Sequence, residues 1–157
     1  MKKMKRTIGY NQTLQFEHVI SRYYITNSEE TGQCFEDAMK TIFDAGYSLA
    51  ENFFYSTNSD IRDEEELLIQ VFLPVNEQNQ DNLPEDYRFQ TYFQVNNLLA
   101  TRVKGDSSNG FSEALGDLLG YVVETELEVT SPIFYCPEVV NEVVYTDLMI
   151  GVKPTSE

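Results

Sequence analysis

One carboxylate in an apolar strand is the side chain of this sequence best placed to do chemistry. Asp147 lies in the stretch Val143–Val152, where apolar residues recur at alternate positions after Tyr145. This period of two predicts a half-buried strand whose aliphatic face lies under a helix. The other face carries the carboxylate, and an unpaired charge among apolar residues is unfavourable. A bound cation would pair with it, whereas a solvent-exposed strand edge is the alternative.

Aromatic and polar residues accompany this carboxylate in a predicted ligand site. Tyrosine rings can stack on a cation, although packing on a sheet face is their commoner role. In the earlier stretch Leu68–Val75, Gln70 stands where Asp147 stands and is a neutral counterpart suited to hydrogen bonding. Phe72 and Met149 occupy matching positions of these two stretches. The predicted ligand-binding residues are Asp147, Tyr145, Tyr135, Tyr55, Gln70, Met149 and Phe72.

Other reactive constellations are weak in this sequence. His18 is the only histidine, and neither Cys34 nor Cys136 has a histidine beside it in sequence to activate a thiolate. The acidic run Asp60–Glu66 lacks the glycine and ligand spacing of a calcium loop and reads as a solvated turn. We therefore expect no catalytic residue, no metal site and no cofactor, and we expect that the protein is not an enzyme.

Length and charge limit the class of protein. The 157 residues, 41% of them hydrophobic, suffice for a single domain with a buried core. The 26 acidic and 11 basic residues give a net charge of −15, which opposes binding to nucleic acid and to anionic membranes. This charge favours basic protein partners or cationic ligands, with solubility alone as the alternative explanation.

The cysteines and the amino terminus bear on location. Cys34 and Cys136 form no CxxC pair, so a reduced thiol state is the simple interpretation, and a single disulfide between them stays open. The basic residues of 1–6 precede no apolar run, unlike a secretory signal. No apolar stretch approaches the roughly 18 residues of a membrane helix. We expect a cytoplasmic protein that binds no membrane.

An internal repeat organises the chain. Phe111 follows Phe35 by 76 residues, and both begin apolar residues at helical spacing; Asp147 follows Gln70 by 77. Two shorter matches, Val19–Arg22 with 99–102 and 53–55 with 133–135, occur in the same order. The sequence therefore predicts one domain over 1–157, with a first repeat at 14–75, a linker at 76–86 and a second repeat at 87–152.

Each predicted repeat has the order β-α-β-β. Two such units would form an α+β fold, a single curved antiparallel sheet with two helices on one face and a pocket between the repeats. A turn is expected at 137–141. The expected helix core comprises Phe35, Met39, Ile42, Leu115, Leu118 and Leu119, packed against Val71, Leu73, Leu148 and Ile150.

The segment Tyr87–Gly105, the helix from Phe111 and the ending Tyr145–Val152 resemble the GyrI-like effector-binding domain, which also follows the DNA-binding parts of some bacterial multidrug-responsive regulators. The resemblance covers nearly the whole chain and implies a two-fold β-α-β-β repeat with a ligand cavity. That family often carries a last-strand glutamate that meets cationic drugs. Asp147 stands at that position and is one methylene shorter.

The resemblance implies a non-enzymatic protein that binds a small hydrophobic ligand, neutral or cationic. The chain is also similar to an uncharacterised group of GyrI-like proteins in Gram-positive bacteria, some of which sit beside secreted polymorphic toxins. That similarity implies the alternative function, a protein-interaction adaptor or accessory protein of a toxin or secretion system. Some GyrI-like proteins are thought to hydrolyse small electrophiles with a carboxylate and a tyrosine, which is the third alternative.

Overall fold

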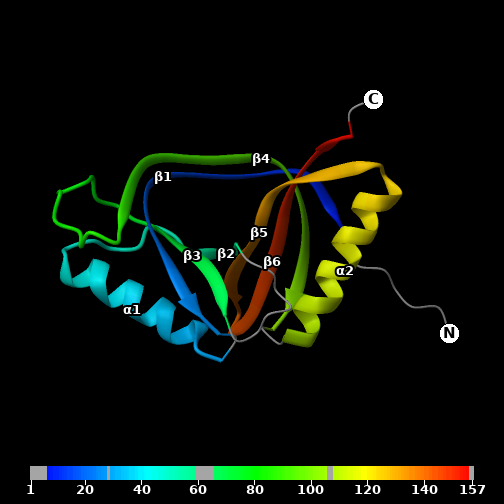
Figure 1. Ribbon diagram of the computed structural model, residues 1–157. Coiled ribbons are helices and arrows are strands. Elements are labelled where there is room, and N and C mark those ends of the chain that lie inside the picture. The colour runs from blue at the N-terminus through cyan, green and yellow to red at the C-terminus, as the bar shows by residue number, and fades with distance from the viewer. Residues whose placement is uncertain (1–6, 28, 59–65, 106–107, 156–157) are drawn as a thin grey trace. The chain divides into compact units, whose positions relative to one another are not determined.

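The described part of the chain forms two helices and six strands in the order β-α-β-β, repeated once (Figure 1). The structure is a computed structural model that describes residues 7–27, 29–58, 66–105 and 108–155. Most of the acidic run predicted as a solvated turn lies outside the described residues. The elements are β1 (Gly9–Thr26), α1 (Thr31–Asp44), β2 (Phe54–Thr57), β3 (Leu67–Pro74), β4 (Arg88–Lys104), α2 (Ser108–Glu124), β5 (Leu127–Val140) and β6 (Val143–Pro154).

The strand pairing makes this an α+β protein, as expected. β3 pairs antiparallel with β1 and β2, and β6 pairs antiparallel with β4 and β5. The chain divides into two compact units. The first, called here the 15–94 unit, is Gln15–Gln94; the second, the 95–157 unit, comprises the described residues of Met1–Leu14 and Val95–Glu157. The long strands β1 and β4 contribute to both units.

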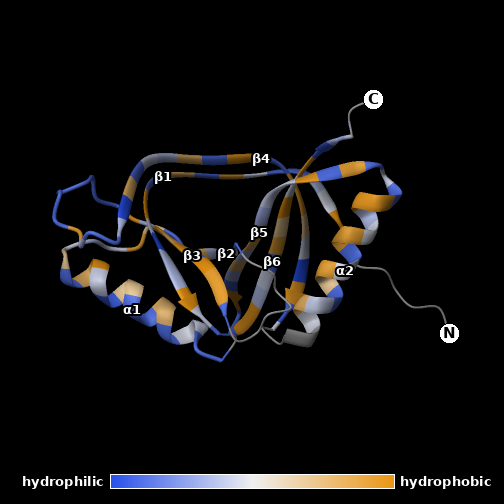
Figure 2. Cartoon of the chain, viewed as in Figure 1, coloured by the Kyte–Doolittle hydropathy of each residue, from blue (hydrophilic) through white to orange (hydrophobic). Residues whose placement is uncertain are grey.

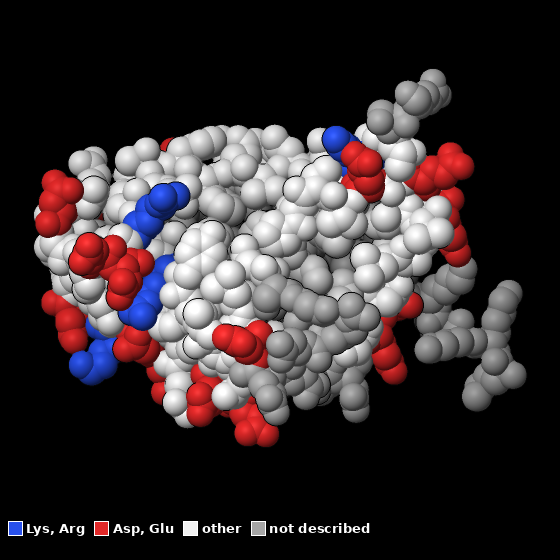
Figure 3. Space-filling view, in the orientation of Figure 1, with Lys and Arg blue, Asp and Glu red and all other residues white. Residues whose placement is uncertain are grey.

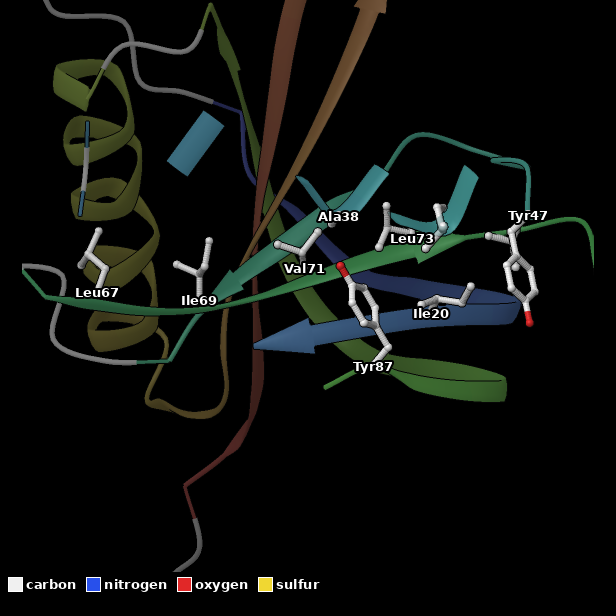
Figure 4. Close-up of a cluster of buried hydrophobic side chains, with 10 residues drawn as sticks. Ile20, Ala38, Tyr47, Leu67, Ile69, Val71, Leu73 and Tyr87 are labelled. Atoms are coloured by element: carbon white, nitrogen blue, oxygen red, sulfur yellow. The ribbon is translucent and has the colours of Figure 1, made fainter. Parts of the chain in front are cut away.

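The core of the 15–94 unit forms between α1 and β3. Apolar and polar residues alternate around α1 (Figure 2), and its inward residues Ala38 and Ile42 are completely buried. Ile69, Val71 and Leu73 of β3 belong to the same cluster, and Figure 4 shows these strand residues with others that complete it. Gly46, at φ 94°, follows the C-cap residue Ala45 and marks the end of α1, as the sequence predicts.

The core of the 95–157 unit forms where α2 contacts β5 and β6. Leu118, Leu148 and Ile150 are buried there, as expected. The expectation for Leu119 is wrong, because its side chain is 41% exposed. Successive helix residues point about 100° apart, so the apolar arc of α2 is wider than the face that the sheet covers.

Equivalent ring contacts support the repeat. The Phe35 ring of α1 lies 4.7 Å from the Tyr55 ring of β2, and the Phe111 ring of α2 lies 5.4 Å from the Tyr135 ring of β5. The two phenylalanines therefore occupy corresponding helix positions, and each ring packs at a tilt against the tyrosine of the following strand.

The predicted match between the first strands of the repeats is wrong by one residue. Ile20 pairs with Leu73, whereas Leu99 pairs with Ile150, so Ile20 corresponds to Leu99 and not to Ala100. His18 precedes Ile20 by two residues, as Asn97 precedes Leu99, and both adopt a left-handed backbone, at φ 57° and 58°. A left-handed residue locally changes a strand's direction, and this shared irregularity fixes the true correspondence.

The turn between β5 and β6 lies later than predicted. Residues 137–140 continue β5, and Val140 pairs with Val143. The reversal is made by Asn141 and Glu142 alone, at φ 52° and 67°. Positive φ at both central residues is the geometry of the two-residue turn that best fits strand twist. The longer β5 brings Cys136 and Glu138 beside β6.

The segment predicted as a linker, 76–86, lies inside the 15–94 unit and is tied to the loop after α1. The Glu77 carboxylate accepts hydrogen bonds from the backbone N–H and hydroxyl of Ser48, each at 2.7 Å. Asn82 donates to the carbonyl of Ala45 at 2.7 Å. Among the described residues, no helix is long and apolar enough to cross a membrane.

Candidate functional site

The candidate site is the helix-free face of β6 and its two neighbours in the 95–157 unit. Residues paired across antiparallel strands project to the same face, and successive residues alternate faces. Tyr135 contacts α2 through Phe111, so its cross-strand partner Leu148 faces the helix and Asp147 faces away. Three cross-strand rows on this opposite face, called here the Asp147 face, are Lys104–Tyr145–Glu138, Arg102–Asp147–Cys136 and Ala100–Met149–Phe134.

Asp147 forms a two-pronged ion pair across the β4–β6 ladder. Arg102 Nε donates to Asp147 Oδ1 at 2.8 Å, and Arg102 Nη2 donates to Oδ2 at 3.1 Å. The expectation of an unpaired carboxylate is therefore wrong, because a strand neighbour supplies the counter-charge. The side chains of Asp147 and Arg102 are 24% and 47% exposed. Ion pairs this accessible to water contribute at most about 1 kcal/mol to stability.

Two further groups surround the Arg102 guanidinium. Its Nη2 also donates to Glu138 Oε2 at 3.0 Å, and its Cζ lies 5.4 Å from the centre of the Tyr145 ring. The hydrogen bonds to Asp147 raise the pKa of Arg102 above its ordinary value, and the charge of Glu138 raises it further. With Lys104 in the row of Glu138, the Asp147 face carries two cations and two carboxylates.

Cys136 lies beside Asp147 in the same row. Burial raises the pKa of its thiol to about 12, and the Asp147 carboxylate adds to the shift because it repels a thiolate. A thiol with this pKa is almost entirely protonated at neutral pH, so Cys136 is a poor nucleophile. Both Cys34 and Cys136 are free, so the disulfide left open by the sequence does not form here.

This raised pKa predicts a loss of stability in alkali. In the unfolded chain the Cys136 thiol has its ordinary pKa of about 9.0, whereas in the folded chain its pKa is about 12. Stability is therefore complete below pH 9 and falls as the pH rises toward 12. At pH 10.5, wild type should lose about 1–2 kcal/mol more than Cys136→Val, relative to pH 8. Urea melts at both pH values measure this, and equal losses would contradict the burial of the thiol.

The third row supplies apolar surface beside the charges. Met149 lies between Ala100 and Phe134, which it pairs with across the two ladders. The side chains of Ala100 and Met149 are half-buried, whereas Phe134 is buried. On the Asp147 face, the charged row of Asp147 and the apolar row of Met149 are therefore neighbours, two residues apart along β6. This pattern suits a ligand with a cationic head and an apolar body.

Two of the seven predicted site residues lie on the helix-covered faces instead. Tyr135 packs on Phe111, and Tyr55 packs on Phe35. Neither tyrosine shares a face with Asp147 or Gln70, because adjacent strand residues point to opposite faces. Of the predicted tyrosines, Tyr145 alone accompanies Asp147.

The remaining two predicted residues, Gln70 and Phe72, lie on the helix-free face of the 15–94 unit. Gln70 donates a long hydrogen bond, 3.5 Å, to the hydroxyl of Ser21. Phe72 is buried, and its ring stacks on Phe54 at 4.7 Å and meets Phe93 at 5.0 Å. The protein's own aromatic rings therefore fill this face around Phe72.

A hollow of about 360 Å³ lies elsewhere in the 95–157 unit, beside the carboxyl end of α2. Tyr121, Thr125 and Lys153 are among the residues that line it, and none of the seven predicted residues does. Within the described part of the chain, no group of three or more histidine, cysteine or acidic side chains could hold a metal ion.

Arg102 and Glu138 are the residues of this face that sequence reasoning missed. Both depend on strand register: Arg102 joins Asp147 through β4, and Glu138 joins through the part of β5 that was predicted as a turn. The available signal was the β-branched and apolar composition of 139–144 flanking a single asparagine, which favours a longer hairpin.

Comparison with known proteins places the chain in a family. Residues 15–153 match the family described as a domain of unknown function, DUF5085. The chain belongs to DUF5085. No curated protein matches the DUF5085 chain by sequence.

Solved structures share its fold. The crystal structure of the EcmrR C-terminal domain has a TM-score of 0.74 and 12% identity, covering 97% of the DUF5085 chain and all of that chain. The structure of EcmrR in its DNA complex has a TM-score of 0.73 and 11% identity, and the match covers 94% of this chain and 58% of that one. The structure of SAV2435 bound to tetraphenylphosphonium has a TM-score of 0.51 and 8% identity, and the match covers 96% of this chain and 94% of that one. The GyrI-like effector-binding fold that the resemblance implies is confirmed as a fold.

Proposed function

We propose that this DUF5085 protein is a non-catalytic binding protein for small hydrophobic cations and that the Asp147 face receives the ligand. The carrying observation is the grouping of Asp147 and Glu138 with the Tyr145 ring, next to the apolar row of Met149. Carboxylates attract a cation, an aromatic face adds to that attraction, and apolar surface accepts the rest of the ligand.

Charge and relatives support this proposal. The net charge of −15 raises the local concentration of cations around the protein, and acidic side chains are spread over the face that Figure 3 displays. SAV2435, which shares the fold, was solved with tetraphenylphosphonium, a hydrophobic cation. Binding without catalysis is favoured over hydrolysis because Asp147 is engaged by Arg102 and the neighbouring thiol has a pKa of about 12.

Asp147→Asn should weaken binding of tetraphenylphosphonium by about 1 kcal/mol, the upper value for a charge pair that is accessible to water. The amide keeps the shape of the carboxylate but loses its charge. Calorimetric titration of wild type and variant measures the difference. Urea melts of the same proteins should differ by at most about 1 kcal/mol, because the Arg102 pair is accessible to water.

Asp117→Asn is the matched control, since it makes the same charge change at an exposed position of α2, which covers the opposite side of the sheet. It should leave the affinity nearly unchanged. If wild type binds no hydrophobic cation, or if Asp147→Asn binds it equally well, the ligand-binding proposal fails. The adaptor function, in which the acidic surface binds a protein partner, would then be the better explanation.

A further inference from the structure

The Arg102 guanidinium already occupies the position that a cationic ligand would take at Asp147. Its two donors to Asp147, its donor to Glu138 and the Tyr145 ring at 5.4 Å form a complete set of cation-binding contacts. The same carboxylates and ring are the groups assigned above to ligand recognition. A ligand and Arg102 must therefore compete for them.

Arg102 is held in a place from which it can be displaced. Its side chain is 47% exposed, and that of Glu138 is 50% exposed. Accessible ion pairs are weak because water screens their attraction and because ordering a long side chain has an entropic cost. Water can therefore receive the guanidinium when another cation replaces it.

Resting on the function proposed above, we infer that Arg102 is an internal occupant of the site and that the ligand is a planar amidinium or guanidinium cation that displaces it. The contacts of Arg102 are a template for that ligand. A flat cation with paired N–H donors can reproduce the two hydrogen bonds to Asp147 while stacking near Tyr145.

A cation without donors has a smaller advantage at this site. A quaternary ammonium supplies charge alone, so it leaves the carboxylate oxygens without the hydrogen bonds that Arg102 makes. An aromatic body attached to the cation would extend toward the adjacent row, where Met149 lies between Ala100 and Phe134. The site should thus distinguish cations by their donors as well as by their charge.

Competition lowers the affinity of the wild-type protein for any ligand at this site. The apparent dissociation constant is the intrinsic one divided by the fraction of molecules in which Arg102 has left. If that fraction is about one in ten, removal of the guanidinium tightens binding roughly tenfold. Arg102→Met removes the charge and the donors but keeps an unbranched side chain.

The test uses benzamidine and phenyltrimethylammonium, which share a ring and a single positive charge and differ in hydrogen-bond donors. Dissociation constants come from amide chemical shifts in NMR titrations of the full chain. In Arg102→Met, both cations should bind roughly tenfold more tightly than in wild type, and benzamidine should bind that variant at least threefold more tightly than phenyltrimethylammonium does. The perturbed amides should lie in 100–104, 134–138 and 145–149.

Two variants make the result specific. Arg88→Met causes the same change of net charge near the other end of β4 and should leave both affinities unchanged. Arg102→Met combined with Asp147→Asn should lose the gain. Benzamidine binding in Arg102→Met that is no tighter than in wild type, or equal affinities of the two cations for Arg102→Met, would overturn the inference. Those results leave the proposed function standing if wild type binds tetraphenylphosphonium through Asp147, whereas the absence of all cation binding overturns both.

Discussion

Replacing Leu118 by alanine should lower the free energy of unfolding by about 2–5 kcal/mol, the cost of losing a buried leucine side chain and leaving a cavity. Leu118 is completely buried on α2, where the helix contacts β5 and β6. Helix and strands on both sides of the cavity are held by their own hydrogen bonds, so the space can close only in part. Urea melts monitored by circular dichroism measure the loss.

The neighbouring leucine is the control for this experiment. Leu119 is the same residue type in the same helix, but its side chain is 41% exposed. Leu119→Ala should therefore change the free energy of unfolding by about 0.5 kcal/mol or less. A loss below about 1 kcal/mol for Leu118→Ala would show that the residues of α2 that face the sheet are wrongly assigned. Similar losses for both variants would show that burial does not distinguish the two positions.

These adjacent leucines also show how far helical spacing reaches as a predictor. The period of 3.6 correctly predicts Ile42 and Leu118 as core residues, because each lies at the centre of an apolar arc. It fails for Leu119, which lies at the edge of that arc. Sequence alone does not say how wide a strip of α2 the sheet covers, since the width depends on packing.

The repeat was predictable because similar residues recur in the same order at nearly constant separation, and the ring contacts of Phe35 with Tyr55 and of Phe111 with Tyr135 agree with it. The one-residue error in the first strands comes from the residues chosen for the match. His18 and Asn97 both adopt a left-handed backbone, and these two positions are the equivalent ones. Nothing in the composition of the strand requires a histidine to take that conformation, so pattern matching followed the shared arginine instead.

The candidate site was predictable only in part for a related reason. Asp147 stood out by itself, as a charge in an apolar strand. Arg102 and Glu138 join it through cross-strand pairing, which is set by register, and a slip of one residue would move either side chain to the other face. The same rule separates Tyr135 from Asp147, although their strands are adjacent.

Phe72→Ala should lower the free energy of unfolding by about 3–5 kcal/mol. The sequence predicted Phe72 as a ligand-binding residue, yet its side chain is only 3% exposed and stacks nearly parallel on Phe54, with an angle of 9° between the rings. The Phe93 ring also contacts Phe72, with 5.0 Å between the ring centres. Removing the ring takes away buried apolar area and the ring–ring attraction together. Phe43→Ala, at a half-exposed position of α1, is the matched control and should have a small effect.

The same variant separates the two roles of Phe72. If its ring belongs to the core, as these contacts indicate, Phe72→Ala should unfold at much lower urea concentration while its folded form binds tetraphenylphosphonium about as well as wild type. If the ring contacts ligand, the variant should lose affinity with a stability loss below about 1 kcal/mol. Melts with and without tetraphenylphosphonium, at a temperature where the variant is folded, distinguish these results. Retained stability with lost affinity would return Phe72 to the ligand site and would mean that the aromatic cluster of Phe54, Phe72 and Phe93 opens to admit a ligand.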